Sequence, residues 1–249
     1  MTWYRDSVGE DYLEVYAHRD DRQGSAEAMS LVKLLDLDAG TRLLDLACGT
    51  GRHSAALAIG GFDVVGIDLS APLLERARER PVDGASFRIV RGDMRRLPFA
   101  DGSFGAVTSL FTSFGYFPTR EEDGRVLSGI ARVLEPGGRF LLDFLNAPLV
   151  IRELVPRSEE VTDARRIVQS RSIHPDGPRV EKKIEVFREG SDEPARVFHE
   201  SVRLYDRADL TDLLREAGLE VDGAYGSFRG EAHTDTSPRT ILTARKIDR

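Results

Sequence analysis

The feature that most constrains the fold is a short apolar run that ends in a glycine-containing turn and then enters a helical pattern. The run covers residues 43–46, the turn covers residues 47–51, and helical spacing begins at about residue 52. In a parallel sheet, this arrangement delivers a ligand to the N-terminal end of a helix. Gly49 and Gly51 allow the backbone to turn sharply and to approach a ligand without a Cβ in the way.

Strand-like and helical patterns alternate over the first 145 residues, which predicts a parallel, doubly wound α/β sheet. A helical region over about residues 10–37, with a break at Gly24-Ser25, precedes this alternation. We expect strands over residues 42–47, 63–68, 86–91, 105–110 and 139–145. We expect helices over residues 52–60, 71–80 and 120–134, and a turn over residues 135–138.

The pattern changes in the second half of the chain, where strand-like segments follow one another without helices between them. We expect strands over residues 165–173, 180–188 and 196–204, forming an antiparallel meander. A helix over residues 206–217 and strands over residues 219–228 and 240–246 then complete a mostly parallel seven-stranded sheet. The predicted organisation is one domain, residues 1–249. Its parts are an N-terminal helical segment (1–37), a cofactor-binding core (38–147), an inserted antiparallel β lid (160–205), and a C-terminal helix with two strands (206–249).

An acidic residue ends the second predicted strand, about 20 residues past the glycine turn, which is typical of a ribose site. Asp68 occupies this position and could accept hydrogen bonds from both ribose hydroxyls. The glycine turn and this acid are also found together in NAD-binding folds. Two details disfavour NAD: the third glycine of the dinucleotide motif would fall at Ser54, and the loop provides only part of a pyrophosphate cradle.

Further motifs follow in a fixed order. The third predicted strand is followed by Arg91-Gly92-Asp93-Met94. Two segments precede the fourth strand, Leu97-Pro98-Phe99 and Asp101-Gly102-Ser103-Phe104. The fifth strand is preceded by Leu134-Glu135-Pro136-Gly137-Gly138. Together with the turn at 47–51 and Asp68, these segments resemble the class I S-adenosylmethionine-dependent methyltransferases over roughly residues 41–145. The resemblance implies a Rossmann-like fold with S-adenosyl-L-methionine as the cofactor.

The resemblance also implies a set of cofactor contacts. The Asp93 carboxylate would accept the adenine amine, and a backbone amide next to it, at Met94, would meet the ring. Leu110 or its neighbour would offer a backbone carbonyl to the methionine amine. In related enzymes an N-terminal helix forms a lid whose arginine binds the methionine carboxylate, a role that would fall here to Tyr16 or Arg19. The complete predicted set is Tyr16, Arg19, Asp45, Ala47, Gly49, Gly51, Asp68, Leu69, Asp93, Met94 and Leu110.

The aromatic stretch over residues 110–117 follows the fourth predicted strand and should lie beside the reactive methyl group, because ligands bind beyond the carboxyl ends of parallel strands. Phe114, Tyr116 and Phe117 would form walls of the acceptor pocket. Methyl transfer by in-line displacement needs alignment, exclusion of water and, for some acceptors, a base. The predicted candidates for that base are His18, Tyr116 and His199.

Charge and composition limit the partners. The formal net charge of −7 does not indicate a nucleic-acid-binding surface, so a small-molecule acceptor is favoured. No apolar run approaches the roughly 20 residues that span a bilayer, and no metal-ligand spacing is present. A single cysteine excludes an internal disulfide. We therefore expect a cytoplasmic enzyme without membrane or metal, with the inserted strands serving as a lid or as a homodimer interface.

The sequence leaves three alternatives open. RNA or protein is a second class of methyl acceptor. A non-catalytic nucleotide-binding protein of the same fold is another possibility, and an NAD-dependent oxidoreductase is a third. The acceptor atom, O, N, C or S, is not determined by these patterns.

Overall fold

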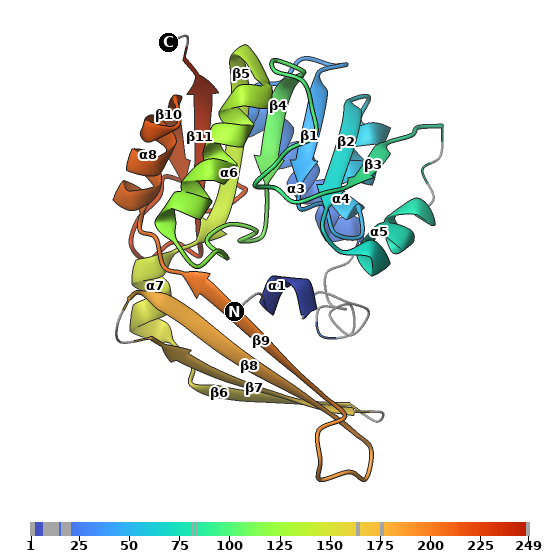
Figure 1. The fold of residues 1–249 in the computed structure, drawn as a ribbon, viewed down its shortest axis with the longest axis vertical. Coiled ribbons are helices and arrows are strands. Elements are labelled where there is room, and N and C mark those ends of the chain that lie inside the picture. Colours follow the sequence, from blue (N-terminus) through green and yellow to red (C-terminus); the bar gives the residue numbers. More distant parts are fainter. Residues whose placement is uncertain are drawn as a thin grey trace.

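The computed structural model describes residues 3–6, 15, 21–80, 82, 84–162, 165–174 and 177–247. Two sheets dominate the fold (Figure 1). A seven-stranded sheet, here sheet A, contains β1 (Arg42–Leu46), β2 (Asp63–Asp68), β3 (Arg88–Arg91), β4 (Phe104–Ser109), β5 (Leu134–Leu145), β10 (Leu219–Tyr225) and β11 (Arg239–Lys246). A four-stranded sheet, here sheet B, contains β6 (Arg157–Thr162), β7 (Arg165–Ile173), β8 (Arg179–Arg188) and β9 (Arg196–Arg203).

Helices precede and flank these strands. They are α1 (Trp3–Asp6), α3 (Asp21–Leu35), α4 (Arg52–Ile59), α5 (Ala71–Arg78), α6 (Arg120–Val133), α7 (Ala147–Glu153) and α8 (Arg207–Glu216). Several of them begin at a residue that caps the helix. Ser70 caps α5 as its sequence suggests, and Asp206 forms a reciprocal capping box with Asp209 at the start of α8.

Sheet A has the strand order β10-β11-β5-β4-β1-β2-β3, and β11 runs antiparallel to the other six strands. The order reverses direction between β1 and β4, so the chain leaves the sheet in opposite directions at that point. In sheets of this type, ligands bind at this switch point, beyond the carboxyl ends of the strands. The predicted mostly parallel seven-stranded sheet with an antiparallel insertion is confirmed.

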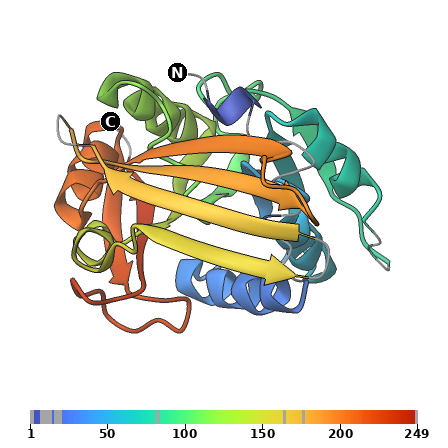
Figure 2. The ribbon, with the colours of Figure 1, turned by 90° about the horizontal axis from the view of Figure 1, so that it is seen from below.

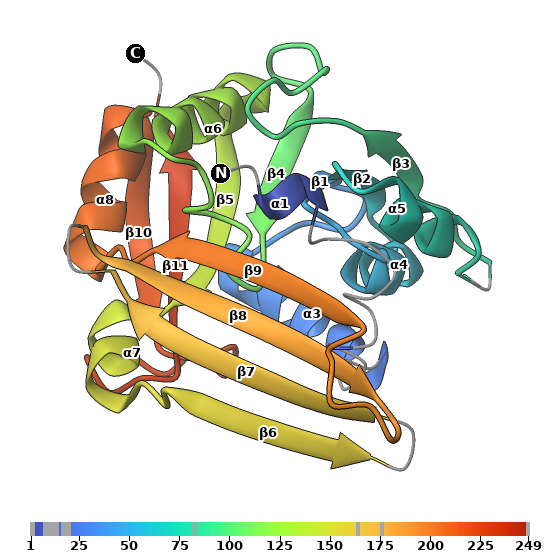
Figure 3. The same ribbon diagram turned by 60° about the horizontal axis from the view of Figure 1, so that its bottom comes forward.

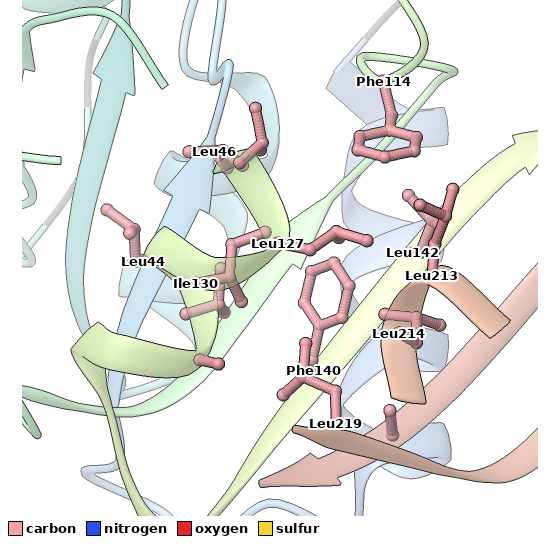
Figure 4. Close-up of a cluster of buried hydrophobic side chains, with 14 of the residues drawn as sticks. Leu44, Leu46, Phe114, Leu127, Ile130, Phe140, Leu142, Leu213, Leu214 and Leu219 are labelled. Atoms are coloured by element: carbon pink, nitrogen blue, oxygen red, sulfur yellow. The ribbon is translucent and has the colours of Figure 1, made fainter. Parts of the chain in front are cut away.

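Both faces of sheet A are covered, because its central strands are apolar on both sides. Leu44 and Leu46 belong to the core under α6 and α8, whereas Leu43 belongs to the core under α3 and α4. Figure 4 shows the first of these cores, with Leu127 and Ile130 of α6 close to Phe140 of β5. Near-continuous apolar strands are what a doubly covered parallel sheet requires.

Sheet B crosses the carboxyl end of sheet A as a separate layer (Figures 2 and 3). Its strands form an antiparallel meander in which each strand pairs with the next in sequence. The short helix α1 lies between the two sheets and contacts β9. The space between the sheets is therefore enclosed by segments that are far apart in the sequence.

Three sequence-based expectations differ from the structure. The predicted break at Gly24-Ser25 was wrong, because α3 runs through both residues. The strand β6 and helix α7 were not predicted; five of the six residues of β6 are exposed, so an edge strand of this kind carries no apolar signal. The turn predicted over residues 135–138 is instead an irregularity inside β5, where pairing moves from Phe104–Leu134 directly to Ala106–Arg139. The remainder of the predicted N-terminal helix, residues 10–20, lies outside the described residues apart from Val15.

Candidate functional site

The glycine turn, residues 47–51, links β1 to α4 through a backbone that is repeatedly left-handed. The φ angles are 61° at Ala47, 56° at Gly49 and 72° at Gly51. The Gly51 amide donates to the Cys48 carbonyl at 2.9 Å, which closes the turn just before α4 begins. The glycines make this path accessible at low conformational cost.

Asp68 at the end of β2 is tied to the glycine turn. Its Oδ2 accepts a hydrogen bond from the Gly49 amide, and its Oδ1 accepts one from the Ser70 amide, both at 2.8 Å. Burial raises the pKa of the Asp68 carboxyl, although the two amide donors act in the opposite direction. Each carboxylate oxygen can accept more than one donor, so capacity remains for ligand hydroxyls.

Asp45 is a second acidic residue next to the glycine turn. It is buried on β1, and its Oδ2 accepts a hydrogen bond from the Ser54 hydroxyl at 2.6 Å. Burial raises the pKa of this carboxyl. Because Ser54 belongs to α4, Asp45 fixes the helix relative to the strand beneath the glycine turn.

A second polar cluster joins α3 to α4. Glu27 Oε2 lies 2.9 Å from His53 Nε2 and 3.0 Å from the Arg52 guanidinium. Burial alone would raise the pKa of Glu27, but the hydrogen bond with His53 and the charge of Arg52 outweigh it and hold that pKa below its usual value. His53 therefore has a structural partner, and its ring stacks on Phe111 with centroids 5.4 Å apart.

A cavity of about 730 Å³ extends from the glycine turn to the inner face of sheet B. Its sheet A end is lined by Ala47, Gly49, Ile67, Asp68, Leu69, Ser70, Leu73, Gly92, Asp93 and Met94. Its other walls come from α1, the segment after β4, α7 and sheet B, and include Trp3, Thr112, Tyr116, Leu149, Leu154, Arg171, Val180, Lys182, Glu200, Val202 and Arg239. A volume of this size is in the range of pockets that hold small ligands.

The Phe-Thr turn, residues 111–113, follows β4 and has left-handed backbone at two residues that are not glycine. The φ angles are 54° at Phe111 and 62° at Thr112. Asp143 on β5 accepts the Phe111 amide on Oδ2 at 2.8 Å and Arg239 Nε on Oδ1 at 2.7 Å. Arg239 also donates to the Thr112 hydroxyl at 2.9 Å. The fully buried Asp143 therefore holds a strained turn at the edge of the cavity.

Sheet B is joined to the end of the same loop. Arg179 of β8 donates to the carbonyls of Gly115, Tyr116 and Phe117 at 3.1–3.3 Å. Arg203 of β9 donates to the Pro118 carbonyl at 2.7 Å, and its backbone amide donates to the Gly115 carbonyl at 2.9 Å. The base of sheet B is therefore attached to the loop that carries Tyr116.

Asp93, which we predict to accept the adenine amine, already has a partner in the protein. Arg95 donates from Nε to Asp93 Oδ1 at 3.1 Å and from its terminal nitrogen to Oδ2 at 2.7 Å, and it also contacts Glu122. The hydrogen bond with Asp93 and the neighbouring negative charges raise the pKa of Arg95. This pairing orients the Asp93 carboxylate at the cavity wall.

The predicted site residues fall into several groups. Seven line the cavity: Ala47, Gly49, Asp68, Leu69, Asp93, Met94 and Tyr116. Asp45, Gly51 and Leu110 lie behind its wall, and the Leu110 carbonyl accepts hydrogen bonds from Ser113. His199 lines an adjoining cavity of about 540 Å³. Tyr16, His18 and Arg19 lie outside the described residues.

Other expected or unforeseen residues also have clear positions. Phe114 was expected in the pocket wall but packs in the core against Phe144 and Tyr205. Asn146 is buried and donates to the carbonyls of Thr234 and Ser237. Arg171, Lys182 and Glu200 line the cavity without any motif to indicate it, because they come from strands whose place over sheet A depends on the tertiary fold.

The residues at the sheet A end of the cavity fit an adenosyl cofactor. Asp68 offers buried carboxylate oxygens to hydroxyl donors, while Ile67, Leu69, Leu73 and Met94 form apolar walls. A Cβ at Gly92 would lie 2.8 Å from Ile67 Cδ1, so a larger residue there would require the Ile67 side chain in the cavity wall to shift. Among the described residues, no group of three or more His, Cys, Asp or Glu could hold a metal ion, and no described helix is long and apolar enough to cross a membrane.

Comparison with known proteins agrees with this geometry. Residues 43–138 match the family model described as a methyltransferase domain. The cypemycin N-terminal methyltransferase of a Streptomyces species is 32% identical over 211 residues, covering 83% of this chain and 84% of that protein. The CcbJ methyltransferase of Streptomyces caelestis has the same fold, with a TM-score of 0.82, 23% identity, and coverage of 99% of this chain and 98% of that one.

A further solved structure contains the cofactor. It is S-adenosylmethionine-bound CalS10, an amino pentose methyltransferase from Micromonospora echinaspora. The TM-score is 0.69 at 23% identity, with 95% of this chain and 97% of that chain covered. The likeness extends beyond the cofactor-binding core, since nearly the whole of each chain is matched.

Proposed function

The chain belongs to the class I S-adenosylmethionine-dependent methyltransferases, and from this premise we propose that it methylates a nitrogen or oxygen atom of a small molecule held beneath sheet B. The observation that carries the proposal is one continuous cavity that reaches from the glycine turn and Asp68 to the inner face of sheet B. It provides room for an acceptor next to the predicted cofactor site, on the side where the loop after β4 lies.

When bound, the cofactor supplies a methyl group on a sulfonium, which a nucleophile can displace directly. The protein needs to align the acceptor and exclude water, because positioning contributes much of the rate in such reactions. Trp3 and Tyr116 pack edge to face at the cavity wall, with centroids 4.9 Å apart, and Val180 and Val202 of sheet B cover it. These apolar walls favour a desolvated acceptor.

Removal of a proton from the acceptor needs a base or access to solvent. Tyr116 is the first candidate of the three predicted bases, because its side chain lines the cavity and Arg179 anchors its backbone carbonyl. His199 lies toward the adjoining cavity, which makes a direct role at the methyl group less favourable. A Tyr116→Phe variant that keeps full activity would remove Tyr116 as the base while leaving the proposed reaction intact.

The names of relatives favour nitrogen as the first acceptor atom to test. One relative that matches most of this chain is named as an N-terminal methyltransferase, and one structural neighbour is named as an amino pentose methyltransferase. Both names describe acceptors that contain an amino group. The net charge of −7 argues against an extended RNA-binding surface, so small amines should be tested as acceptors before nucleic acids.

Cofactor binding is tested by calorimetric titration with S-adenosylmethionine and S-adenosylhomocysteine. Asp68→Ala should weaken both by at least about tenfold, since a hydrogen bond to a charged group contributes about 1.5–3 kcal/mol. Asp68→Asn keeps the side-chain shape and one acceptor oxygen, and it should bind with intermediate affinity. Asp212→Ala is the matched control, because Asp212 is an exposed aspartate on α8. Normal cofactor affinity in folded Asp68→Ala would contradict the assigned site.

Methyl transfer is tested with three acceptor groups: small primary amines, matched alcohols, and short peptides with a free or acetylated N-terminus. Release of S-adenosylhomocysteine together with a methylated product is the readout. Transfer to amines or alcohols supports the proposal. RNA and whole protein are assayed separately, and transfer confined to either of them would overturn the small-molecule assignment. Wild-type protein that fails to bind the cofactor would support a non-catalytic role.

A further inference from the structure

A row of charged side chains crosses the inner face of sheet B. Arg171 of β7 lies directly opposite Lys182 of β8, and Lys182 lies directly opposite Glu200 of β9. All three side chains line the cavity. The adjacent cross-strand row on the same face contains the apolar residues Val180 and Val202, which also line the cavity. The charged row therefore lies directly beside an apolar row on the face of sheet B that lines the cavity.

The charge of Arg171 is held by neutral oxygens. Its guanidinium donates to the Ser158 hydroxyl at 3.0 Å, to the Val155 carbonyl at 3.5 Å and to the Gln169 side-chain oxygen. Within the described ranges, no carboxylate forms an ion pair with Arg171, whereas Lys182 lies 3.6 Å from Glu200. Two cations directly opposite each other on neighbouring strands repel. Glu200 offsets the charge of Lys182, whereas the charge of Arg171 is met only by the neutral oxygens named above, so an added anion would be favourable beside Arg171.

We propose that Arg171 and Lys182 form a subsite for an anionic group of the methyl acceptor, a carboxylate or a phosphate. A guanidinium of fixed orientation suits a planar or tetrahedral oxyanion, because it offers several donors in a rigid fork. The three contacts to Ser158, Val155 and Gln169 hold that fork in place before a ligand arrives. This subsite deepens the proposed function and rests on it.

The position of the row gives the acceptor a direction. The acidic residues Asp68 and Asp93 line the opposite end of the cavity, on sheet A, where the adenosyl group is expected. An acceptor with its anionic group against sheet B would present its other end toward the methyl group. Glu200 sits beside Lys182 and reduces the positive charge of the row, so it should limit the affinity for anions.

Binding can be followed through Trp3, the single tryptophan of the chain, which lines the cavity. The protein is first saturated with S-adenosylhomocysteine and then titrated with phenylacetate, phenyl phosphate or the neutral phenylacetamide. We expect both anions to bind at least about tenfold more tightly than the amide, with the preference falling as salt is added. The ratio of phenyl phosphate to phenylacetate binding distinguishes the two oxyanion sources.

Charge-neutralising variants give predictions of opposite sign. Arg171→Gln and Lys182→Gln should remove most of the preference for anions, and Arg171→Lys should restore part of it. Glu200→Gln should strengthen anion binding severalfold, which loss of a merely structural contact would not do. Arg188→Gln is the matched control, because Arg188 is an exposed arginine of β8 that lines neither cavity. Thermal unfolding shows whether each variant is folded.

Several results would overturn the subsite. Equal binding of amide and anions, no binding of either anion, or the same loss in Arg188→Gln as in Arg171→Gln would each do so. Weaker S-adenosylhomocysteine binding in Arg171→Gln, measured by calorimetry, would assign Arg171 to the cofactor instead. These results are distinct from failure of the proposed function, which is scored by methyl transfer to the amine and alcohol acceptors in the wild-type protein.

Discussion

Two turns border the cavity, and they reach the same left-handed backbone region by different means. The glycine turn uses Gly49 and Gly51, with φ angles of 56° and 72°. The Phe-Thr turn uses Phe111 and Thr112, with φ angles of 54° and 62°, although a β-branched residue is a genuine outlier there. Two of the three left-handed positions of the first turn are glycines, the third being Ala47 with a φ of 61°. The second turn contains no glycine and is held in place by Asp143 and Arg239 from two distant strands.

The comparison shows where conformational strain is stored in this site. In the glycine turn, the main cost of folding is conformational entropy, because glycine loses more backbone freedom on folding than other residues do. In the Phe-Thr turn, the penalty lies in the folded state, at about 1–3 kcal/mol for each strained residue. Buried polar contacts must outweigh that strain, so the second turn should depend far more strongly on residues outside it.

Removal of Asp143 should have the largest effect. Asp143→Ala leaves Arg239 without its carboxylate and the Phe111 amide without its acceptor, so unfolding free energy should fall by about 3–5 kcal/mol. Arg239→Met should also destabilise the protein, because Asp143 would remain buried without its cation. The double variant should be less destabilised than the sum of the two. Denaturant-induced unfolding gives the coupling energy between them.

The matched control for this cycle is the ion pair between Asp222 of β10 and Arg139 of β5, the two strands that flank β11. Its aspartate is about one-third exposed, at 34% of the side chain. Exposed ion pairs contribute about 0–1 kcal/mol, so Asp222→Ala should have a much smaller effect. Similar losses for Asp143→Ala and Asp222→Ala would mean that the Phe-Thr turn does not depend on its buried anchor.

The same contrast explains how much could be predicted from the sequence. The glycine turn and Asp68 are local: apolar strand residues, glycines and an acid at a fixed interval indicate both the element and its position. Asp143 and Arg239 lie 32 and 128 residues from Phe111, so no spacing rule links them to the turn. The Leu110 carbonyl accepts hydrogen bonds from Ser113 within the turn, a local contact that the apolar strand pattern does not indicate.

In sheet B, too, the positions of the strands could largely be predicted from the sequence, but the surroundings of their side chains could not. Strand patterns with turn residues between them predicted β7, β8 and β9 within one or two residues at each end. The inner-face residues Arg171, Lys182 and Glu200 could not be assigned to a cavity, because alternation identifies the two faces of a strand but not what each face covers. The exposed edge strand β6 gave no periodic apolar signal at all.

Alanine substitutions in the glycine turn should have the next largest effect, and they should differ from each other. A Cβ at Gly51 would lie 2.9 Å from Phe87 Cζ and 3.2 Å from Ala77 Cβ, whereas one at Gly49 would meet only Leu73 Cδ1 at 3.9 Å. Gly51→Ala should therefore lose about 2–4 kcal/mol through left-handed strain plus overpacking, and Gly49→Ala only about 1–2 kcal/mol. Equal losses in unfolding measurements would indicate that backbone strain alone governs this turn.

The pH dependence of stability tests Asp123 of α6. Its carboxylate lies 3.6 Å from Arg203, the residue that donates to the Pro118 carbonyl at the end of the loop after β4. Asp123 is fully buried and accepts a hydrogen bond from Tyr205 at 2.8 Å, and burial raises its pKa to about 6. Because the folded chain keeps this proton to higher pH than the unfolded chain, the stabilising contribution is complete below about pH 4 and is lost as pH rises through about 6. Relative to Asp123→Asn, the wild type should lose on the order of 2 kcal/mol over that interval.

Unfolding of both proteins between pH 4 and pH 7 measures this difference directly. Other carboxyl groups titrate in the same range, but they are common to both proteins and cancel in the comparison. Asp101→Asn provides the control, because Asp101 is highly exposed. A stability difference that stays constant with pH, or that changes in favour of the wild type, would contradict the raised pKa of Asp123.

The substitution with the smallest expected effect is Thr112→Gly. It gives the most direct comparison of the two turns, because it places a glycine in the Phe-Thr turn. Thr112→Gly removes the left-handed strain, worth about 1–2 kcal/mol, but also the hydroxyl that accepts from Arg239, worth about 1 kcal/mol. The net change in unfolding free energy should therefore be close to zero. Thr112→Val keeps the branched side chain and its strain but loses the hydroxyl, so it should be about 1 kcal/mol less stable than wild type. If the glycine variant proves the less stable of the two, the turn is not strained in the way its backbone angles indicate, and the two turns differ in sequence but not in how they are held.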